Sequence, residues 1–323
     1  MCTLEPVPAN LRTLTGFPGP YHAICREERN LAALLYHLLL VGDNLERFLK
    51  VAGYGQPLHP TQSALYFEYA FLRDLWATLD PRRSTAEGTP TQKLEAANKK
   101  KREVILELLQ PAESEYLKNC GVLEFNTHFG AGSRPSRREI QSPSTWSLPA
   151  YAKTLTDPTE ILKVSRFKWA FNAKPDLVLH SDHDHALCIE AKLESGEGSY
   201  PATAAEKLIF KNLGLTYVGQ LDIQRYLMTE LLGIETEFVF LVADRKVGKT
   251  AEKVLSWAEA FETLELDGQP AFVREWVSGF QGCASHGMHQ ERSSTPAETG
   301  GPLGRHEVGG FGFRLHQPPG GAS

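Results

Sequence analysis

The chain has 323 residues, and its 34 basic and 39 acidic side chains give a formal net charge of −5. A hydrophobic content of 41% and a charged content of 23% indicate a globular protein with room for about two domains. The longest apolar run, residues 31–41, is shorter than the roughly 20 residues that a membrane-spanning helix needs, which excludes a membrane protein. The slightly acidic balance gives no overall sign of nucleic-acid binding.

The five cysteines are scattered along the chain and form no CxxC pair. The first residues lack the basic and apolar regions of a secretory signal. We therefore expect neither a disulfide framework nor a cysteine-bound zinc ion, and we predict a cytoplasmic location.

Residues 1–110 are predicted to be mostly helical. Leucine and aromatic residues recur at helical spacing in three segments. These segments are residues 24–40, 61–79 and 93–109. A linker that contains Pro, Ser, Thr and Gly, residues 81–92, separates the last two segments, and Pro111 ends the third.

Residues 111–280 change in character and predict a mixed α/β core. Four short segments have the length and the β-forming residues of strands. They are Arg166–Phe171, Asp176–His180, Ala186–Leu193 and Glu237–Val242. Helices are predicted over 202–213, over 217–232 with Gly233 as the C-cap, and over 251–261. The order strand, strand, strand, helix, strand favours helices packed on a small sheet.

Residues 281–323 are predicted to form a disordered C-terminal tail. They hold ten of the 27 glycines but only three Ile, Leu or Val residues. Such a segment buries too little apolar surface to offset its chain entropy. Its histidines and its cysteine match no metal-ligand spacing, which favours a solvated tail.

The candidate site lies in a predicted β-hairpin, because two apolar strands flank a short polar connector. If the hairpin is symmetric about His183, Asp176 lies opposite Glu190 with their Cβ atoms about 4.5–5.5 Å apart. Lys192, two residues beyond Glu190, shares that face of the sheet. The other face carries four apolar residues that point into a core: Leu177, Leu179, Ile189 and Ala191. Facing carboxylates repel unless a cation lies between them, and Mg²⁺ prefers one or two carboxylates with water and phosphate oxygens.

Pro175-Asp176 followed by Glu190-Ala191-Lys192 resembles the signature of the PD-(D/E)XK nuclease superfamily. The resemblance covers roughly residues 160–245. The order of the predicted elements is similar to the restriction-endonuclease-like αβββαβ core of that superfamily. The fold implied is therefore this α/β core with a helical N-terminal domain and the C-terminal tail.

The resemblance also implies roles for four residues. Asp176, Glu190 and the main-chain carbonyl of Ala191 would bind Mg²⁺ or Mn²⁺. Lys192 would position the attacking water. A bound metal ion lowers the pKa of such a water and stabilises charge on the phosphoryl oxygens.

Members of the superfamily usually supply one more acid from a helix before the sheet. The candidates are Glu28, Glu115 and Glu160, and Glu28 is favoured because it begins the most apolar predicted helix. The alternative for Glu28 is a favourable contact with the helix dipole alone. Gln220 and Gln224 lie one turn apart on a later helix, where members often place a polar residue, and both are candidates for binding nucleic acid.

Residues 243–250 (ADRKVGKT) fit a permissive phosphate-binding P-loop between a predicted strand and a predicted helix, with Lys249 as its lysine. Only about 30 ordered residues come after it, which is too few for the further strands of a P-loop domain. The alternative is a basic loop in which Thr250 caps the next helix and Lys249 contacts backbone phosphates.

The connector of the hairpin also suggests a metal site. It contains three histidines and two aspartates within six residues: His180, Asp182, His183, Asp184 and His185. At the tip of a hairpin these residues are more typical of a solvent-exposed turn. The loop after the site contains Tyr200, which either stacks on a base or belongs to a plain loop.

Basic side chains are unevenly distributed. Residues 82–174 contain 16 basic and 10 acidic residues, a net charge of +6, which leaves −11 for the rest of the chain. The densest run consists of Lys99, Lys100, Lys101 and Arg102. Such a run is either a solvated helix face or, beside a phosphodiester site, a surface that follows the nucleic-acid backbone.

These patterns together predict a Mg²⁺-dependent endonuclease that hydrolyses phosphodiester bonds, with DNA favoured over RNA as the partner. A role in restriction or anti-phage defence is implied by the resemblance alone. The N-terminal helices would serve regulation, homo-oligomerisation or target choice. The alternatives are a non-catalytic nucleic-acid-binding or scaffolding module on the same fold, and a P-loop NTPase that uses Lys249.

Overall fold

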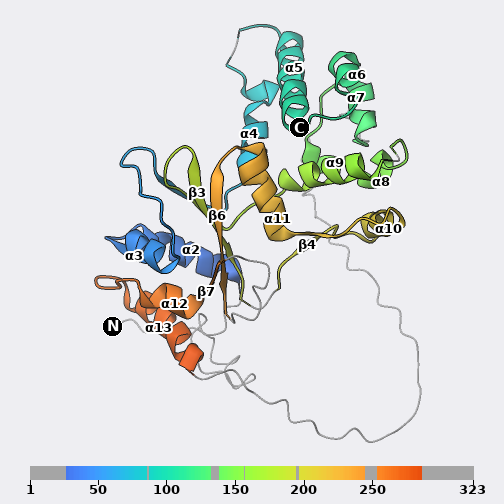
Figure 1. The fold of residues 1–323 in the computed structure, drawn as a ribbon. Helices are drawn as coiled ribbons and strands as arrows, with labels where there is room; N and C mark the ends of the chain where they lie inside the picture. Colours follow the sequence, from blue (N-terminus) through green and yellow to red (C-terminus); the bar gives the residue numbers. More distant parts are fainter. Residues whose placement is uncertain are drawn as a thin grey trace, which may run out of the picture. The chain divides into compact units, whose positions relative to one another are not determined.

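A five-stranded mixed sheet in the order β1-β2-β3-β6-β7 organises the fold (Figure 1). This computed structural model describes residues 27–85, 87–131, 138–155, 157–193, 196–243 and 253–285, with side chains up to 279. The strands are β1 (Ala64–Phe67), β2 (Leu177–His180), β3 (His185–Ala191), β6 (Glu235–Val242) and β7 (Lys253–Ser256). β1, β2 and β3 are antiparallel neighbours, whereas β6 runs parallel to β3 and β7 runs parallel to β6. A separate two-stranded ladder joins β4 (Ser199–Tyr200) to β5 (Val218–Gly219).

Four helices cover one face of the sheet (Figure 1). They are α2 (Glu28–Leu39), α3 (Asn44–Val51), α12 (Trp257–Glu262) and α13 (Ala271–Ser285). Their apolar residues pack against alternate residues of β2 and β3, namely Leu177, Leu179, Leu187, Ile189 and Ala191. The prediction that these strands turn this apolar face towards a core is therefore confirmed.

The remaining helices pack on the other face or beside it. They are α4 (Phe71–Thr78), α5 (Pro90–Leu109), α6 (Ser114–Asn119), α7 (Val122–His128), α8 (Leu148–Tyr151), α9 (Pro158–Ala170), α10 (Ala204–Asn212) and α11 (Gln220–Arg225). Short 3₁₀ turns occupy residues 81–83 and 143–145, and a π-helical segment, η5 (Tyr226–Leu231), continues α11. Val178, Cys188 and Phe240 of the sheet share this second core with Phe167 and Leu227.

β1 and β2 are neighbours in the sheet although residues 68–176 separate them in the chain. Phe67 pairs with Leu177, and the Glu68 amide donates to the Asp176 carbonyl at 2.7 Å. The helices α4–α9 are thus an insertion between two adjacent strands. The sheet draws on both sides of the boundary predicted near residue 110.

Three predictions of secondary structure are wrong. Arg166–Phe171 ends helix α9 and is no strand, because Asp157 caps a helix that buries Ile161, Val164 and Phe167. Residues 61–79 form β1 and then α4, not one helix. Residues 251–261 do not form one helix: β7 pairs with β6, and the Ser256–Glu259 capping box starts α12 only at Trp257.

Other predictions are confirmed within the described residues. The helices predicted over 24–40, 93–109 and 202–213 correspond to α2, α5 and α10. The helix predicted over 217–232 is confirmed only from Gln220, where α11 and then η5 follow strand β5; Gly233 comes after them with φ +69°. Helix α13 extends to Ser285, so it includes the first residues of the predicted tail, and the rest of that tail lies outside the described residues.

Candidate active site

The β2–β3 hairpin brings Asp176 and Glu190 together on one face of the sheet. Leu177 pairs with Ile189 and Val178 with Cys188, which is the predicted register. Continued by one residue, this register places Asp176 opposite Glu190. Oδ2 of Asp176 accepts a hydrogen bond from the Ala191 amide at 2.8 Å, so the Asp176 carboxylate reaches across to β3.

Glu190 is the most enclosed acid of the site, with 2% of its surface exposed. Its Oε1 accepts from Lys192 Nζ at 2.7 Å and from Gln220 Nε2 at 2.6 Å. Its Oε2 accepts from Gln224 Nε2 at 2.6 Å. Three donors therefore hold a buried carboxylate, which is the condition under which burial of a charge is tolerated.

Lys192 is fixed through both its backbone and its side chain. Its amide donates to the Leu241 carbonyl at 2.7 Å, and its carbonyl accepts from Trp257 Nε1 at 2.9 Å. Its Nζ lies 2.7 Å from Oε1 of Glu190 and 3.7 Å from Oε2 of Glu28. Burial acts to lower the pKa of Lys192, but these carboxylates outweigh it and raise the pKa, so the amine stays protonated.

Glu28 is the third acid that reaches the site. It begins α2, and its Oε1 accepts from the Leu193 amide at 3.0 Å. Of the other two candidates, Glu160 accepts from the Ala112 amide at 3.5 Å and Glu115 lies on α6 within the insertion. The preference for Glu28 among the three acids agrees with this placement.

Burial, and after it the charge of Glu190, raises the pKa of Asp176 to about 7, whereas the Ala191 amide and Lys192 act in the opposite direction. The thiol of Cys188, which lies two residues before Glu190 on the same face, has a pKa well above its usual value because it is buried. The site therefore combines an acid that resists ionisation with an amine that retains its proton.

A loop and the β4–β5 ladder border the site through Gln220. The Gly198 amide lies 3.4 Å from Oε1 of Gln220, while the Gln220 amide donates to the Gly198 carbonyl at 2.8 Å. Oε1 of Glu197 accepts from the Leu221 amide at 3.2 Å. Gln220 thus connects residues 197–198 with Glu190.

Tyr200 comes after this loop and packs inward. Its ring stacks on that of Trp169 with centroids 5.1 Å apart, and Trp169 is 3% exposed. Burial and the charge of Glu190 raise the pKa of the Tyr200 hydroxyl. Neither Glu197 nor Trp169 is among the residues predicted for the site, and no pattern in the sequence marks them.

The two glutamines predicted to bind nucleic acid, Gln220 and Gln224, both contact Glu190. Gln224 is 1% exposed, which leaves it no surface for nucleic acid. This burial argues against a contact between Gln224 and nucleic acid.

The basic run on α5 is divided between surface and interior. Lys99 and Lys100 are exposed. Lys101 is 2% exposed and pairs with Glu139, and Arg102 donates to the Leu117 carbonyl. The charge of Lys101 is thus paired inside the protein, which argues against a contact between Lys101 and nucleic acid.

The P-loop prediction lacks its structural context. Residues 244–252, which include Lys249, lie outside the described residues. The next described element along the chain is strand β7, whereas a P-loop opens a helix.

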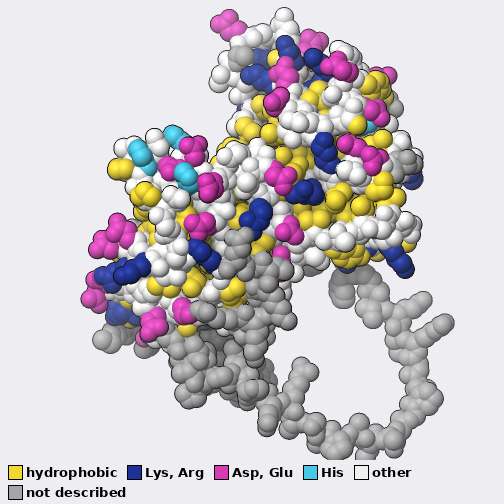
Figure 2. All heavy atoms as spheres, in the orientation of Figure 1, with side chains coloured by type: hydrophobic (Ala, Val, Ile, Leu, Met, Phe, Trp, Pro, Cys, Tyr) yellow, Lys and Arg dark blue, Asp and Glu magenta, His cyan; other side chains and the backbone are white. Residues whose placement is uncertain are grey.

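The connector between β2 and β3 is a turn. Oδ1 of Asp182 accepts from the amides of Asp184 and His185 at 2.8 and 2.7 Å, which is how Asp stabilises a tight turn. Histidine side chains gather over this end of the hairpin (Figure 2). Nowhere in the described ranges do three or more His, Cys, Asp or Glu side chains form a group that could hold a metal ion.

The donor set at the hairpin still suits a cation that needs few protein ligands. Asp176 and Glu190 offer hard carboxylate oxygens on one face, and Mg²⁺ is usually bound by one or two carboxylates together with water and substrate phosphate. The residues present therefore fit Mg²⁺ or Mn²⁺ better than zinc, which takes four protein ligands in structural sites.

No protein-family model, no curated protein and no solved structure matches this chain. Among the helices of the described ranges, none is long and apolar enough to cross a membrane. The function must therefore be argued from the geometry of the site.

Proposed function

We propose that this chain is a metal-dependent nuclease that hydrolyses phosphodiester bonds of DNA. The observation that carries the proposal is the placement of Asp176, Glu190 and Lys192 on one face of the β2–β3 hairpin. The Ala191 amide joins Asp176 to β3, and Lys192 Nζ contacts Glu190 at 2.7 Å. Two carboxylates and a buried ammonium group at one point form a set of groups that can bind a metal ion and a phosphodiester.

The order of elements around the site supports the PD-(D/E)XK superfamily as the origin of this chain. Once the insertion 68–176 and the additional elements α3, β4, α10 and β5 are set aside, α2, β1, β2, β3, α11 with its continuation η5, and β6 follow in the order αβββαβ. The first three strands are antiparallel, and β6 runs parallel to β3. In a restriction-endonuclease-like core of this chain, residues 64–67 would form the first strand, whereas the sequence pattern predicts residues 166–171 in that role.

Asp176, Glu190 and the Ala191 carbonyl would hold Mg²⁺ or Mn²⁺, with Glu28 close by. The ion, when bound, supplies an acidified water and charge compensation for the phosphoryl group. Protonated Lys192 cannot act as a base. It acts as a donor that orients the water and stabilises negative charge on phosphate oxygens.

Gln220 and Gln224 have a positioning role in this proposal. They donate to both oxygens of Glu190 and fix the orientation of its carboxylate. This arrangement matches the need to preorganise a charged site before the substrate binds.

The decisive experiment incubates the full chain with supercoiled plasmid, single-stranded DNA and duplex RNA, each with Mg²⁺, with Mn²⁺ or with EDTA. We expect divalent-dependent cutting of DNA, and a loss of about 10²-fold or more in Lys192→Met because a charge-stabilising donor is removed. Lys50→Met is the matched control, since Lys50 is exposed on α3, which packs on the opposite face of the sheet.

Cutting that persists in EDTA, or that is equal in Lys192→Met and wild type, would contradict the proposal. DNA binding without cutting under any metal condition would favour the non-catalytic binding module instead. Circular dichroism of both variants separates loss of activity from loss of fold.

A further inference from the structure

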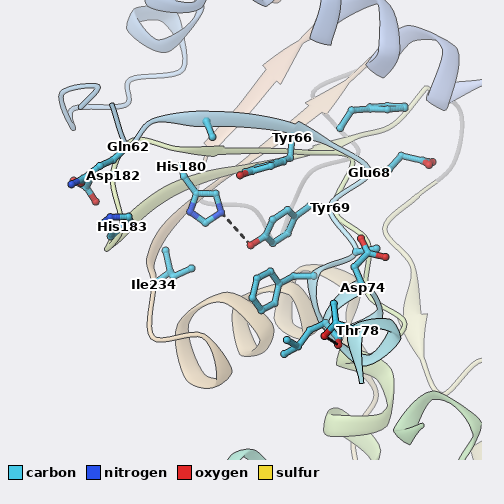
Figure 3. A pocket seen from close by; sticks show the side chains of 15 residues that line it. Gln62, Tyr66, Glu68, Tyr69, Asp74, Thr78, His180, Asp182, His183 and Ile234 are labelled. Carbon is cyan, nitrogen blue, oxygen red and sulfur yellow. Dashed lines mark hydrogen bonds between the residues drawn. The ribbon is translucent and has the colours of Figure 1, made fainter. Parts of the chain in front are cut away.

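A groove of about 690 Å³ lies along the edge strand β1, at the end of the sheet that carries the β2–β3 turn (Figure 3). Four aromatic residues line it: Tyr66 and Phe67 of β1, Tyr69 between β1 and α4, and Phe71 of α4. The Phe67 ring lies 6.0 Å from that of Tyr36, and the other three rings belong to the groove. Tyr66 is 46% exposed and Phe71 is 39% exposed, so two of these rings present apolar surface to the solvent. His180 and Asp182 of the β2–β3 hairpin also line it.

The aromatic rings form a continuous row. Tyr66 lies 5.5 Å from Tyr69, and Tyr69 is stacked on Phe71 at 5.8 Å, measured between ring centroids. The Tyr69 hydroxyl lies 3.2 Å from Nε2 of His180, which ties the row to β2 (Figure 3). The faces of such rings carry the negative end of a quadrupole and attract cations.

The charged groups of the groove are acidic. Asp74, Asp182 and Glu68 line it, and neither Lys nor Arg is found among its described lining residues. Lys174 and Arg29 neutralise Glu68, and Asp182 contacts His185, whereas Asp74 is exposed and makes no ion pair with another described residue. The groove therefore favours a cation and disfavours a phosphate backbone.

The backbone of β1 adds a second means of recognition. In the described part of the sheet β1 is the terminal strand and pairs only with β2. A strand at the edge of a sheet offers unpaired N–H and C=O groups, to which an extended peptide can add. Alternate side chains of such a peptide point to the same face as Tyr66.

We propose that this groove binds an extended, basic segment of a partner protein, which adds to β1 and places an Arg or Lys side chain over the aromatic row beside Asp74. The residues that line the groove do not include Asp176, Glu190, Lys192 or Glu28 of the candidate active site. Binding in the groove needs no metal ion, so its test is independent of the nuclease proposal.

The test measures fluorescence anisotropy of a labelled nonapeptide with Arg at alternate positions, added to the full chain in EDTA. The control peptide carries citrulline, which keeps the shape of Arg and removes its charge. We expect Asp74→Asn to weaken binding by about two- to fivefold, as for one exposed ion pair. We expect Tyr66→Ala to weaken it about fivefold or more through the lost cation–π contact.

Asp267→Asn, the same change at an exposed aspartate outside the groove, should leave the affinity unaltered. Equal affinity for the Arg and citrulline peptides, or equal binding by Asp74→Asn and wild type, would overturn the proposal. Binding of labelled single-stranded oligothymidylate that Asp74→Asn strengthens and Tyr66→Ala weakens would also overturn it, because the groove would then be a nucleic-acid surface. If Tyr66→Ala fails to fold, the exposed Asp74 position still decides the question.

Discussion

Asp176→Asn should stabilise the metal-free protein while it abolishes cutting. The pKa of Asp176 is raised from 3.8 to about 7, mainly by burial and then by Glu190. A carboxyl whose pKa is higher in the folded state binds its proton more tightly there. Its contribution therefore favours folding at acid pH and is lost as the pH rises from about 4 to about 7.

The size of the effect can be worked out from the same shift. About three pKa units correspond to about 4 kcal/mol between the two protonation states. Relaxation of a partly exposed carboxylate and the lost attraction to Lys192 reduce this value, so we expect about 2 kcal/mol of stabilisation at pH 8. Asn retains an oxygen that can accept the hydrogen bond from the Ala191 amide.

Urea unfolding in EDTA between pH 5 and pH 8 measures the difference. The advantage of Asp176→Asn should grow as the pH rises to about 7 and then stay constant. Asp182→Asn is the matched control: burial acts to raise the pKa of Asp182, but hydrogen bonds from Asp184 and His185 outweigh it and lower the pKa. That variant should gain no stability at pH 8. An Asp176→Asn protein less stable than wild type at pH 8 would refute the reasoning.

Three further outcomes are expected from the same contacts. Gln224→Leu should lower the free energy of unfolding by about 1–3 kcal/mol, because Oε2 of buried Glu190 loses its donor; unchanged urea unfolding would contradict this role. Lys101→Met should lower the melting temperature, measured by calorimetry, without changing DNA affinity, measured by gel shift. The double variant Lys99→Gln, Lys100→Gln should weaken DNA binding and leave the melting temperature unaltered. The reverse pattern would contradict the assignment of Lys101 to the interior. Mn²⁺ affinity should rise by up to about tenfold per pH unit below pH 7, since binding must displace a proton from Asp176; calorimetric affinities that are constant from pH 5.5 to 8 would exclude this linkage.

The sequence predicts the hairpin well because its determinants are local. Alternation of apolar residues assigns the two faces, and a short polar connector limits the register, so Leu177 pairs with Ile189 as expected. Glu28 is also found from a local signal, the start of an apolar helix, although its contact with Leu193 joins residues 165 positions apart.

Strand β1 could not be predicted from local sequence patterns. Leu65, Tyr69, Leu72 and Trp76 have helical spacing, and no neighbouring residue reveals that 64–67 pairs with a strand beyond the insertion. The pairing is long-range, and it is the tertiary contact with Leu177 and Val178 that overrides the local pattern. The same limit applies to Lys101, whose partner Glu139 lies 38 positions away on a different segment.

Lys192 is the point where these distant segments meet. Its amide is bonded to β6, its carbonyl to Trp257 of α12, and its side chain to Glu190 and Glu28. The ammonium group therefore keeps its position as long as the sheet and its covering helices are intact. Glu190, by contrast, is oriented by two glutamines of α11, one of which also binds the loop at Gly198. Any adjustment of the site on binding a ligand should thus begin on the α11 side, through Gln220, and leave Lys192 fixed.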